Sequence, residues 1–585
     1  MTLKHLLHKP AALMQTTPPL TGLDLTFAQW LHTQHPAPND AALWLAALTS
    51  HQWGRGHACL DVPMLMAQPA ALLGWTTAQV QLMPTGVAQT ANDLPWTQGE
   101  NSPLVYDAAH GLLYLRRAWQ AEQFIRNNIA QRLQQPQPVP NDVTQRLDDL
   151  FPNSTQAHDL QRRACEVAAH NAVTLITGGP GTGKTTTVVR LLALLAGNQS
   201  EPLRIHLAAP TGKAAARLSE SITQAMHQLP AALQARIPTQ AQTLHRLLQA
   251  HTTNTRVTPL ASDVVVVDEA SMIDLEMMAR LLQAVPLQAR LVLLGDKDQL
   301  ASVEAGAVMS QLCSGTLLSS QTVTLTHSHR FDANRGIGRW AQAVNHAPED
   351  VPALWQQTPD WLDNLSNHPM PDVTRLTHPR PQDPTWFAGV RHGWHEYLTH
   401  LQNVSQGCDA VHARSVLKAF AKFSVLCALR EGPWGVAQLN PHIEKALQLN
   451  PHGRAWYVGR PVMVTRNDYA LDLMNGDIGV CLPNPEGELR VAFPSSDPTR
   501  VRWIAPSRLD SVDTVFAMTV HKSQGSEFTH VLLVVPAQNA PVLTRELLYT
   551  GLTRARERLT VWAAQSDVLF NACQQRVLRS GGLAQ

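Results

Sequence analysis

The sequence has little charge, and the charges that it has nearly cancel. Asp, Glu, Lys and Arg make up only 16% of its 585 residues, and 46 basic side chains against 45 acidic ones leave a net charge of +1. An ordinary globular chain carries roughly 25% charged residues. This balance excludes a strong basic field over the whole surface, of the kind that draws a protein to a polyanion. Any such ligand must therefore bind in a local groove.

Paired cysteines and long apolar runs are also missing. The seven cysteines are scattered without a C-x-x-C pair, which argues against a disulfide framework and against a zinc ribbon. No apolar run reaches about 18 residues, and the start of the chain holds too short an apolar stretch for a signal peptide. We therefore expect a protein of the reducing cytoplasm that is neither exported nor inserted in a membrane.

A zinc-protease motif is absent as well. His395 and His400 frame a glutamate, but the spacing is one residue longer than H-E-x-x-H. At about 100° per residue the two imidazoles do not share a helix face, so this pattern does not indicate a metalloprotease.

The length of the chain exceeds what one hydrophobic core usually supports, so we expect several domains. Residues 1 to about 115 show the pattern of amphipathic helices, for example at 24–32 and 41–48, and the proline-bearing stretch 131–140 is typical of a linker. We predict three parts: a helical N-terminal docking domain at 1–135, a first α/β lobe at 141–335 and a second lobe at 336–585.

Short apolar runs alternate with helical segments in both predicted lobes. In the first lobe the runs are 173–177, 205–209, 263–267, 291–294 and 322–325, and in the second they are 423–429, 515–519, 530–535 and 558–562. This alternation predicts two parallel sheets wrapped by helices. The β-rich stretch 455–512 predicts a small barrel inserted in the second lobe. The segment 345–410, rich in Pro, Trp and His, fits no element pattern.

A glycine-rich loop at 178–185 connects the first of these runs to a helical segment. In this context backbone N–H groups and a helix N-terminus face a polyanion, Lys184 reaches the β- and γ-phosphates, and the Thr185 hydroxyl ligates Mg²⁺. The sequence therefore predicts a nucleoside triphosphate site, with ATP and Mg²⁺ as its ligands. The residues expected to contact the nucleotide are Gly178, Gly179, Pro180, Gly181, Thr182, Gly183, Lys184, Thr185 and Thr186.

Adjacent carboxylates follow the apolar run at 263–267. Asp268 would hold the Mg²⁺ shell, and Glu269 would orient or deprotonate the attacking water. Gln299 follows the next run and could sense the γ-phosphate. These positions are what a metal-dependent nucleotide hydrolase requires.

Five further short sequence motifs, which we call boxes, follow in order. Together with the loop and the acids they resemble the motifs of superfamily 1 helicases over about 155–565. The boxes are 209–215, 242–248, 326–331, 519–528 and 549–556. The resemblance implies two RecA-like lobes, an SH3-like barrel at 455–512, and an adenine contact by Gln161. It implies that Arg330 and Arg554 reach from the second lobe across a cleft to the γ-phosphate, where they stabilise transition-state charge. It also assigns backbone contacts with a nucleic-acid strand to Thr211, Lys213, Thr243, His245, Thr519 and His521.

Within that superfamily the amino-acid sequence of the loop and boxes, together with that of residues 48–57, most resembles the RecD family, the alpha subunits of exodeoxyribonuclease V. This resemblance implies an ATP-driven 5′→3′ DNA helicase that assembles with RecB- and RecC-like subunits in a RecBCD-type complex. Such a complex processes double-strand-break ends for recombination. No acidic cluster beyond the nucleotide carboxylates indicates a nuclease, so we expect that activity in a partner.

Two other functions stay open at this point. One is a stand-alone DNA or RNA repair helicase, and the other is a regulatory ATPase subunit without motor activity. The complete set of boxes from both lobes favours a motor. The modest N-terminal part favours the kind that works in a complex.

Overall fold

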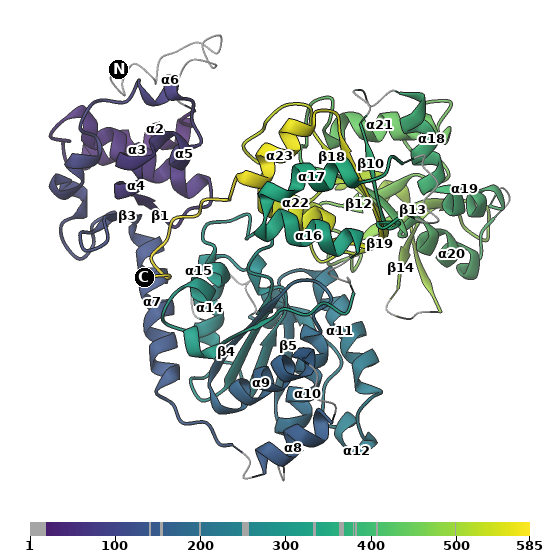
Figure 1. Cartoon of the computed structure of the whole chain (residues 1–585), viewed down its shortest axis with the longest axis horizontal. Helices are drawn as coiled ribbons and strands as arrows, with labels where there is room; N and C mark the ends of the chain where they lie inside the picture. The colour runs from purple at the N-terminus through teal and green to yellow at the C-terminus, as the bar shows by residue number, and fades with distance from the viewer. Residues whose placement is uncertain are drawn as a thin grey trace.

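A computed structural model of the chain describes residues 19–585 except 140–141, 153–155, 198–200, 249–256, 331–334, 362–367, 378–379, 381–382, 405–406, 496 and 498. Figure 1 shows an N-terminal domain that stands apart from two α/β lobes and is joined to them by one long helix, α7 (Arg116–Leu133). The second lobe lies above the first in this view.

The first lobe is built on a parallel six-stranded sheet. In spatial order its strands are β6 (Gln242–Thr243), β5 (Ile205–Ala209), β7 (Val264–Val267), β8 (Arg290–Gly295), β4 (Val173–Gly178) and β9 (Thr322–Leu325). The five predicted runs are confirmed as strands, and β6 is an addition. Strands β4, β7 and β8 are buried along their whole length, because helices cover both faces of a parallel sheet.

Two hydrophobic clusters lie on the two faces of this sheet. The helices of the lobe are α8 (Val143–Leu150), α9 (Gln156–His170), α10 (Lys184–Ala196), α11 (Gly212–Met226), α12 (Ala231–Gln234), α13 (Leu244–Leu247), α14 (Leu275–Ala284) and α15 (Val308–Ser314). Ile125 and Ile129 of α7 belong to the cluster that contains α14, so α7 packs on the first lobe.

The second lobe holds the second predicted parallel sheet, which is also confirmed. Its strands, in spatial order, are β10 (Val373–Leu376), β19 (Ala555–Ala563), β18 (Phe528–Val535), β11 (Phe423–Cys427) and β17 (Ala517–Thr519). The surrounding helices are α16 (Gly336–His346), α17 (Val351–Gln357), α18 (Pro384–Gly393), α19 (His395–Gln402), α20 (Ala410–Phe420), α21 (Val436–Leu447), α22 (Arg545–Leu552) and α23 (Ser566–Gln574). The segment 345–410 thus supplies an edge strand and three helices.

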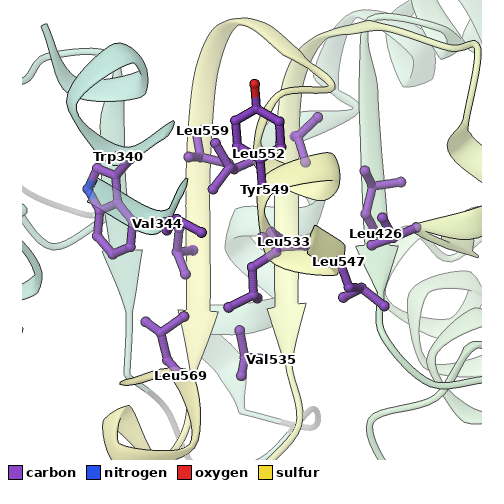
Figure 2. Close-up of a cluster of buried hydrophobic side chains, with 14 of the residues drawn as sticks. Trp340, Val344, Leu426, Leu533, Val535, Leu547, Tyr549, Leu552, Leu559 and Leu569 are labelled. Carbon is purple, nitrogen blue, oxygen red and sulfur yellow. The ribbon is translucent and has the colours of Figure 1, made fainter. Parts of the chain in front are cut away.

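One face of this sheet is packed by α16, α22 and α23. Figure 2 shows Trp340 and Val344 of α16, Leu547 and Leu552 of α22 and Leu569 of α23 over the strands. The ring of Tyr549 belongs to the same cluster, but its hydroxyl points away from it (Figure 2) and is bonded in the first lobe, as described below.

An antiparallel five-stranded sheet is inserted between α21 and β17. Its spatial order is β15 (Val501–Ile504), β14 (Leu489–Pro494), β13 (Ile478–Pro483), β12 (Pro461–Val464) and β16 (Val512–Thr514). The sheet has a small hydrophobic core of its own. Closure of these strands into an SH3-like barrel stays a prediction.

The N-terminal domain has a separate core built around α2 (Gly22–Gln34) and α3 (Asp40–Gly54), which match the predicted helices. It also contains α4 (Val62–Ala67), α5 (Pro69–Leu73), α6 (Thr77–Val80) and an antiparallel sheet in the order β1 (Cys59–Asp61), β3 (Leu112–Leu115) and β2 (Leu104–Asp107). The expected helical domain is therefore confirmed, and the small sheet is an addition, because strands of three or four residues are too short to show an alternating pattern.

Residues 576–585, which we call the C-terminal strap, leave α23 of the second lobe and return to the first lobe and the N-terminal domain (Figure 1). Ala58 donates its N–H to Ser580 O at 2.8 Å, and the N–H of Gly582 lies 3.0 and 3.1 Å from the two carboxylate oxygens of Glu122 on α7. Leu583 is buried in the first-lobe cluster that α7 covers. The strap therefore ties all three parts together.

Among the residues that the structure describes, no helix combines the length and the apolar character needed to cross a bilayer.

Candidate nucleotide and nucleic-acid site

The loop between β4 and α10 has the form of a phosphate cradle. Gly181 and Gly183 have φ values of 76° and 83°, a left-handed conformation that favours glycine. The Lys184 ammonium donates to the carbonyls of Gly178 at 2.5 Å and Gly179 at 3.1 Å. The lysine charge is thus held beside a glycine-rich turn and a helix N-terminus, which together favour an anion.

Gln161 of α9 supports this loop from behind. Its side-chain N–H donates to Thr182 O at 3.3 Å, and Arg190 donates to its carbonyl oxygen at 3.2 Å. A Cβ at Gly183 would lie 2.3 Å from the Gln161 nitrogen, so the two positions are tightly packed. The adenine contact of Gln161 stays a prediction.

Asp268 and Glu269 lie where β7 ends, opposite the loop. Burial raises the pKa of Asp268 to about 6, the negative charge of Glu269 acts in the same direction, and Lys184 opposes both. Glu269 has a φ of 52°, which is uncommon for a residue with a Cβ and holds its backbone at a sharp turn. Two carboxylates are thereby kept together in a half-buried place that favours a bound cation.

A hydrogen-bonded chain crosses the junction of the lobes beside these acids. Arg554, which follows α22, donates to the Gln299 oxygen at 2.7 Å, and the Gln299 amide donates to Asp296 at 2.9 Å. The hydroxyl of Tyr549 donates to the same Asp296 oxygen at 3.1 Å. Burial raises the pKa of Asp296, and Lys184 opposes this. The second lobe therefore contacts the segment that follows β8 and carries Gln299.

Arg330 reaches the cavity from the first lobe, whereas the resemblance implied that it comes from the second. It follows β9, the edge strand of the first sheet, and a Cβ at Gly181 would lie 2.4 Å from the Cβ of Arg330. The expectation that both arginines come from the second lobe was wrong for Arg330, because residues 328–330 pack on the phosphate loop soon after β9. Arg554 does come from the second lobe.

These groups surround one cavity of about 480 Å³ between the lobes. The candidate residues that line it are Pro180, Gly181, Thr182, Gly183, Lys184, Thr185, Thr186, Asp268, Glu269, Gln299, Arg330 and Arg554. Gly178 and Gly179 line a neighbouring cavity on the far side of the loop. The structure thus gathers all the predicted catalytic residues at one place.

The predicted strand contacts lie at the carboxyl ends of strands, where parallel sheets bind ligands. The hydroxyls of Thr211, Thr243 and Thr519 each accept a hydrogen bond from the backbone N–H three residues later, at 3.2, 3.2 and 3.3 Å. Thr211 follows β5, Thr243 ends β6 and Thr519 ends β17. β6 and β17 are edge strands of the two parallel sheets, and β5 lies next to β6. Each hydroxyl thus caps a helical turn whose remaining N–H groups can meet a phosphate.

The remaining three candidates differ in their exposure. Burial lowers the pKa of Lys213 to about 8, against the attraction of Asp477 in the inserted sheet. Burial, with the charge of Arg579, also lowers the pKa of His521. His245 is exposed on α13. Contact of these residues with a nucleic-acid strand stays a prediction.

Four residues that the sequence analysis did not single out also belong to the site: Arg217 and Glu527 line the cavity, and Asp296 and Tyr549 form the chain described above. Arg217 lies one helical turn after Lys213 on α11, which is the signal that could have identified it. Glu527 lies within the box at 519–528, but nothing local indicates its partners.

Three family models match parts of the chain. They are described as RecBCD enzyme subunit RecD, N-terminal domain, at residues 18–114; AAA domain at 161–305; and UvrD-like helicase C-terminal domain at 514–562. The first covers the N-terminal core, and the other two cover the phosphate loop with its acids and the strands that flank Arg554.

Whole-chain relatives agree with these matches. The chain is 38% identical over 523 residues to RecBCD enzyme subunit RecD of Mycobacterium tuberculosis (strain CDC 1551 / Oshkosh), covering 84% of this chain and 85% of that one. It is 33% identical over 619 residues to RecBCD enzyme subunit RecD of Haemophilus influenzae, covering 95% and 94%. It is also 31% identical over 512 residues to an ATP-dependent RecD2 DNA helicase of Deinococcus radiodurans, covering 85% of this chain and 62% of that protein.

Proposed function

The chain belongs to the RecD family of helicase subunits, and from this premise we propose that it is the 5′→3′ DNA motor of a RecBCD-type helicase-nuclease. It uses ATP to move along one strand and to open duplex DNA at a double-strand break. RecB- and RecC-like subunits complete the assembly, and the nuclease resides in one of them. Because chromosomal DNA is the substrate, we place its work in the cytoplasm.

One observation carries the proposal most directly, namely the bond between Arg554 of the second lobe and Gln299 of the first at 2.7 Å. Both side chains line the cavity that contains the phosphate loop. A γ-phosphate in that cavity would interact with both, so the spacing of the lobes would follow the state of the nucleotide. This coupling is what a translocating motor needs.

The residues present fit a Mg²⁺ ion held with the nucleotide. Thr185 and Asp268 offer a hydroxyl and a carboxylate, the hard oxygen ligands that Mg²⁺ prefers. A cation there would also offset the repulsion between Asp268 and Glu269 that helps to raise the Asp268 pKa. When bound, the ion supplies neutralisation of charge on the β- and γ-phosphate oxygens.

The chain's own side chains supply the rest of the chemistry. Glu269 orients the attacking water and accepts its proton on a carboxylate oxygen. Lys184 moves from its loop carbonyls to the phosphates, and Arg330 and Arg554 stabilise the negative charge that grows on the transferred group. Arg554 is held by its bond to Gln299 before the reaction, which lowers the cost of reorganisation.

Nucleic acid lies across both lobes in this proposal. The helical turns capped by Thr211 and Thr243 and the turn after Thr519 hold the phosphodiester backbone, with Lys213, His245 and His521 as further contacts. Binding through backbone phosphates does not depend on base sequence. The inserted sheet serves as a wall against which the duplex separates.

Steady-state ATP hydrolysis with single-stranded DNA, with RNA and without a polymer tests the motor. We expect strong stimulation by DNA, weak stimulation by RNA and loss of turnover in Lys184→Ala. Turnover that is independent of any polymer would instead indicate a regulatory ATPase. Unwinding by the chain alone, without gain from RecB- and RecC-like subunits, would indicate a stand-alone helicase.

A further inference from the structure

The carboxylate of Glu527 lies at the wall of the nucleotide cavity, close to three arginines. It pairs with Arg330 at 2.7 Å and with Arg217, and its second oxygen lies 4.0 Å from Arg556. The side chain of Glu527 is only 12% exposed. One buried anion therefore serves several guanidinium groups.

These partners come from different parts of the molecule. Glu527 precedes β18 in the second lobe, Arg217 lies on α11 of the first, and Arg330 lies against the phosphate loop. All three line the cavity together with Lys184 and Asp268. The carboxylate thus lies on the wall opposite the phosphate loop and connects the two lobes.

A carboxylate and a terminal phosphate bind guanidinium groups in the same manner, through oxygen atoms that accept paired N–H donors. A guanidinium that is held by Glu527 cannot offer the same N–H groups fully to a phosphate. The arginines also repel one another: burial lowers the pKa of Arg330 to about 9, and the charges of Arg217, Arg556 and Arg554 act in the same direction. The carboxylate of Glu527 therefore offsets the repulsion among these arginines.

We propose that Glu527 is a positioning residue that holds Arg217 and Arg330 in the nucleotide-free enzyme and gives them up to the γ-phosphate of ATP. The inference rests on the proposed function of this cavity. ADP has no γ-phosphate, so it leaves the pairs of Glu527 intact. Glu527 therefore lowers the affinity for ATP without lowering the affinity for ADP, and it returns to the arginines after phosphate leaves. Each ATP that binds also breaks both of these ion pairs between the lobes.

Nucleotide binding to the full chain, without DNA, tests this role. In Glu527→Gln the neutral amide holds the arginines weakly, so we expect a non-hydrolysable ATP analogue to bind on the order of three- to tenfold tighter, while the Kd of ADP changes less than about twofold. Glu527→Asp should bind both nucleotides nearly as the wild type does. Glu557→Gln is the matched control, because it removes a nearby exposed carboxylate of β19 beside Arg556.

The kinetics should divide in the same way. Glu527→Gln is expected to lower KM for ATP severalfold and to leave kcat within about threefold. In an Arg330→Gln background the added Glu527→Gln change should no longer tighten binding of the analogue, because the partner is gone. Weaker binding of the analogue, or equal tightening of analogue and ADP, would overturn the inference. If DNA does not stimulate ATP hydrolysis by the wild type, the proposed function is wrong. The comparison of ATP-analogue and ADP binding would still test the role of Glu527.

Discussion

Arg554 of the second lobe donates a hydrogen bond to the Gln299 oxygen of the first lobe, at 2.7 Å. It is 2% exposed, and its Nε also donates to Thr550 O at 3.1 Å, so the guanidinium is fixed before a nucleotide arrives. A fixed cation acts more strongly on a transition state than a mobile one, since no reorganisation is needed. The contribution of Arg554 should therefore appear in the rate of hydrolysis more than in binding.

We expect Arg554→Lys to lower kcat for DNA-stimulated ATP hydrolysis by at least about a hundredfold. A lysine keeps the charge but loses the planar fork that can hold both Gln299 and a phosphate. The binding of ADP should hardly change. Steady-state kinetics and ADP binding measure the two effects, and a variant with normal kcat and weak ADP binding would contradict the assignment.

At the level of single residues, the sequence allowed Lys184, Asp268 and Gln299 to be placed because each follows an apolar strand of a parallel sheet. The carboxyl ends of such strands meet at one edge, so three local patterns define one place in space. Arg217 and Glu527 could not be paired in advance, since their contact joins residues far apart in the sequence. The side from which Arg330 enters the cavity depends on how residues 328–330 pack on the phosphate loop, which no local pattern records.

Strands that form a continuous apolar run could be predicted from the sequence, and the shortest strands could not. All nine predicted strand runs of the two lobes appear as strands, because a run that is buried on both faces is apolar at every position. β6 has two residues and β1 has three, too few to show a period. β10 lies in the segment 345–410, where four strand residues stand among prolines and tryptophans.

The inserted sheet approaches the predicted nucleic-acid contacts through the turn that precedes β13. A Cβ at Gly212 would lie 3.0 Å from the Cβ of Met474, and the Lys522 ammonium donates to the Asn475 oxygen at 3.2 Å. The turn therefore lies beside both the first-lobe and the second-lobe boxes. A strand bound there would pass directly against it.

We expect the double change Met474→Ala and Asn475→Ala to reduce unwinding of a forked duplex at least about threefold more than it reduces DNA-stimulated ATP hydrolysis. The reason is that a wall separates strands without taking part in the chemistry. Glu486→Ala, an exposed change in the β13–β14 turn of the same sheet, is the control. Parallel loss of the two activities would show that the turn is not a wall.

The C-terminal strap is the feature that joins the whole molecule, and Glu122 lies at its anchoring point. Burial raises the pKa of Glu122 to about 7, although the N–H of Gly582, the hydroxyl of Tyr114 and the charge of Arg126 act against this. A carboxyl whose pKa is raised by folding binds its proton more tightly in the folded state. The stabilisation that follows is complete below the unfolded pKa and is lost as the pH rises through about 7.

We therefore expect the unfolding free energy of the wild type to fall, relative to that of Glu122→Gln, by up to about 3 kcal/mol between pH 4.5 and pH 7.5. The glutamine cannot titrate, so the difference between the two proteins isolates this group from all others. Chemical denaturation followed by hydrogen exchange in α7 measures it. Two parallel pH profiles would mean that Glu122 stays ionised throughout this range.

The strap has a mechanical consequence as well. The polypeptide leaves the N-terminal domain through α7, runs through both lobes and comes back to the same flank, so its path forms a closed circuit (Figure 1). A rigid displacement of the second lobe must then either break the hydrogen bonds of the C-terminal strap or pull on the N-terminal domain to which the strap is bonded. A neighbouring subunit bound to that domain would therefore feel the movement of each ATPase cycle as a force, without contacting the lobes that hydrolyse ATP.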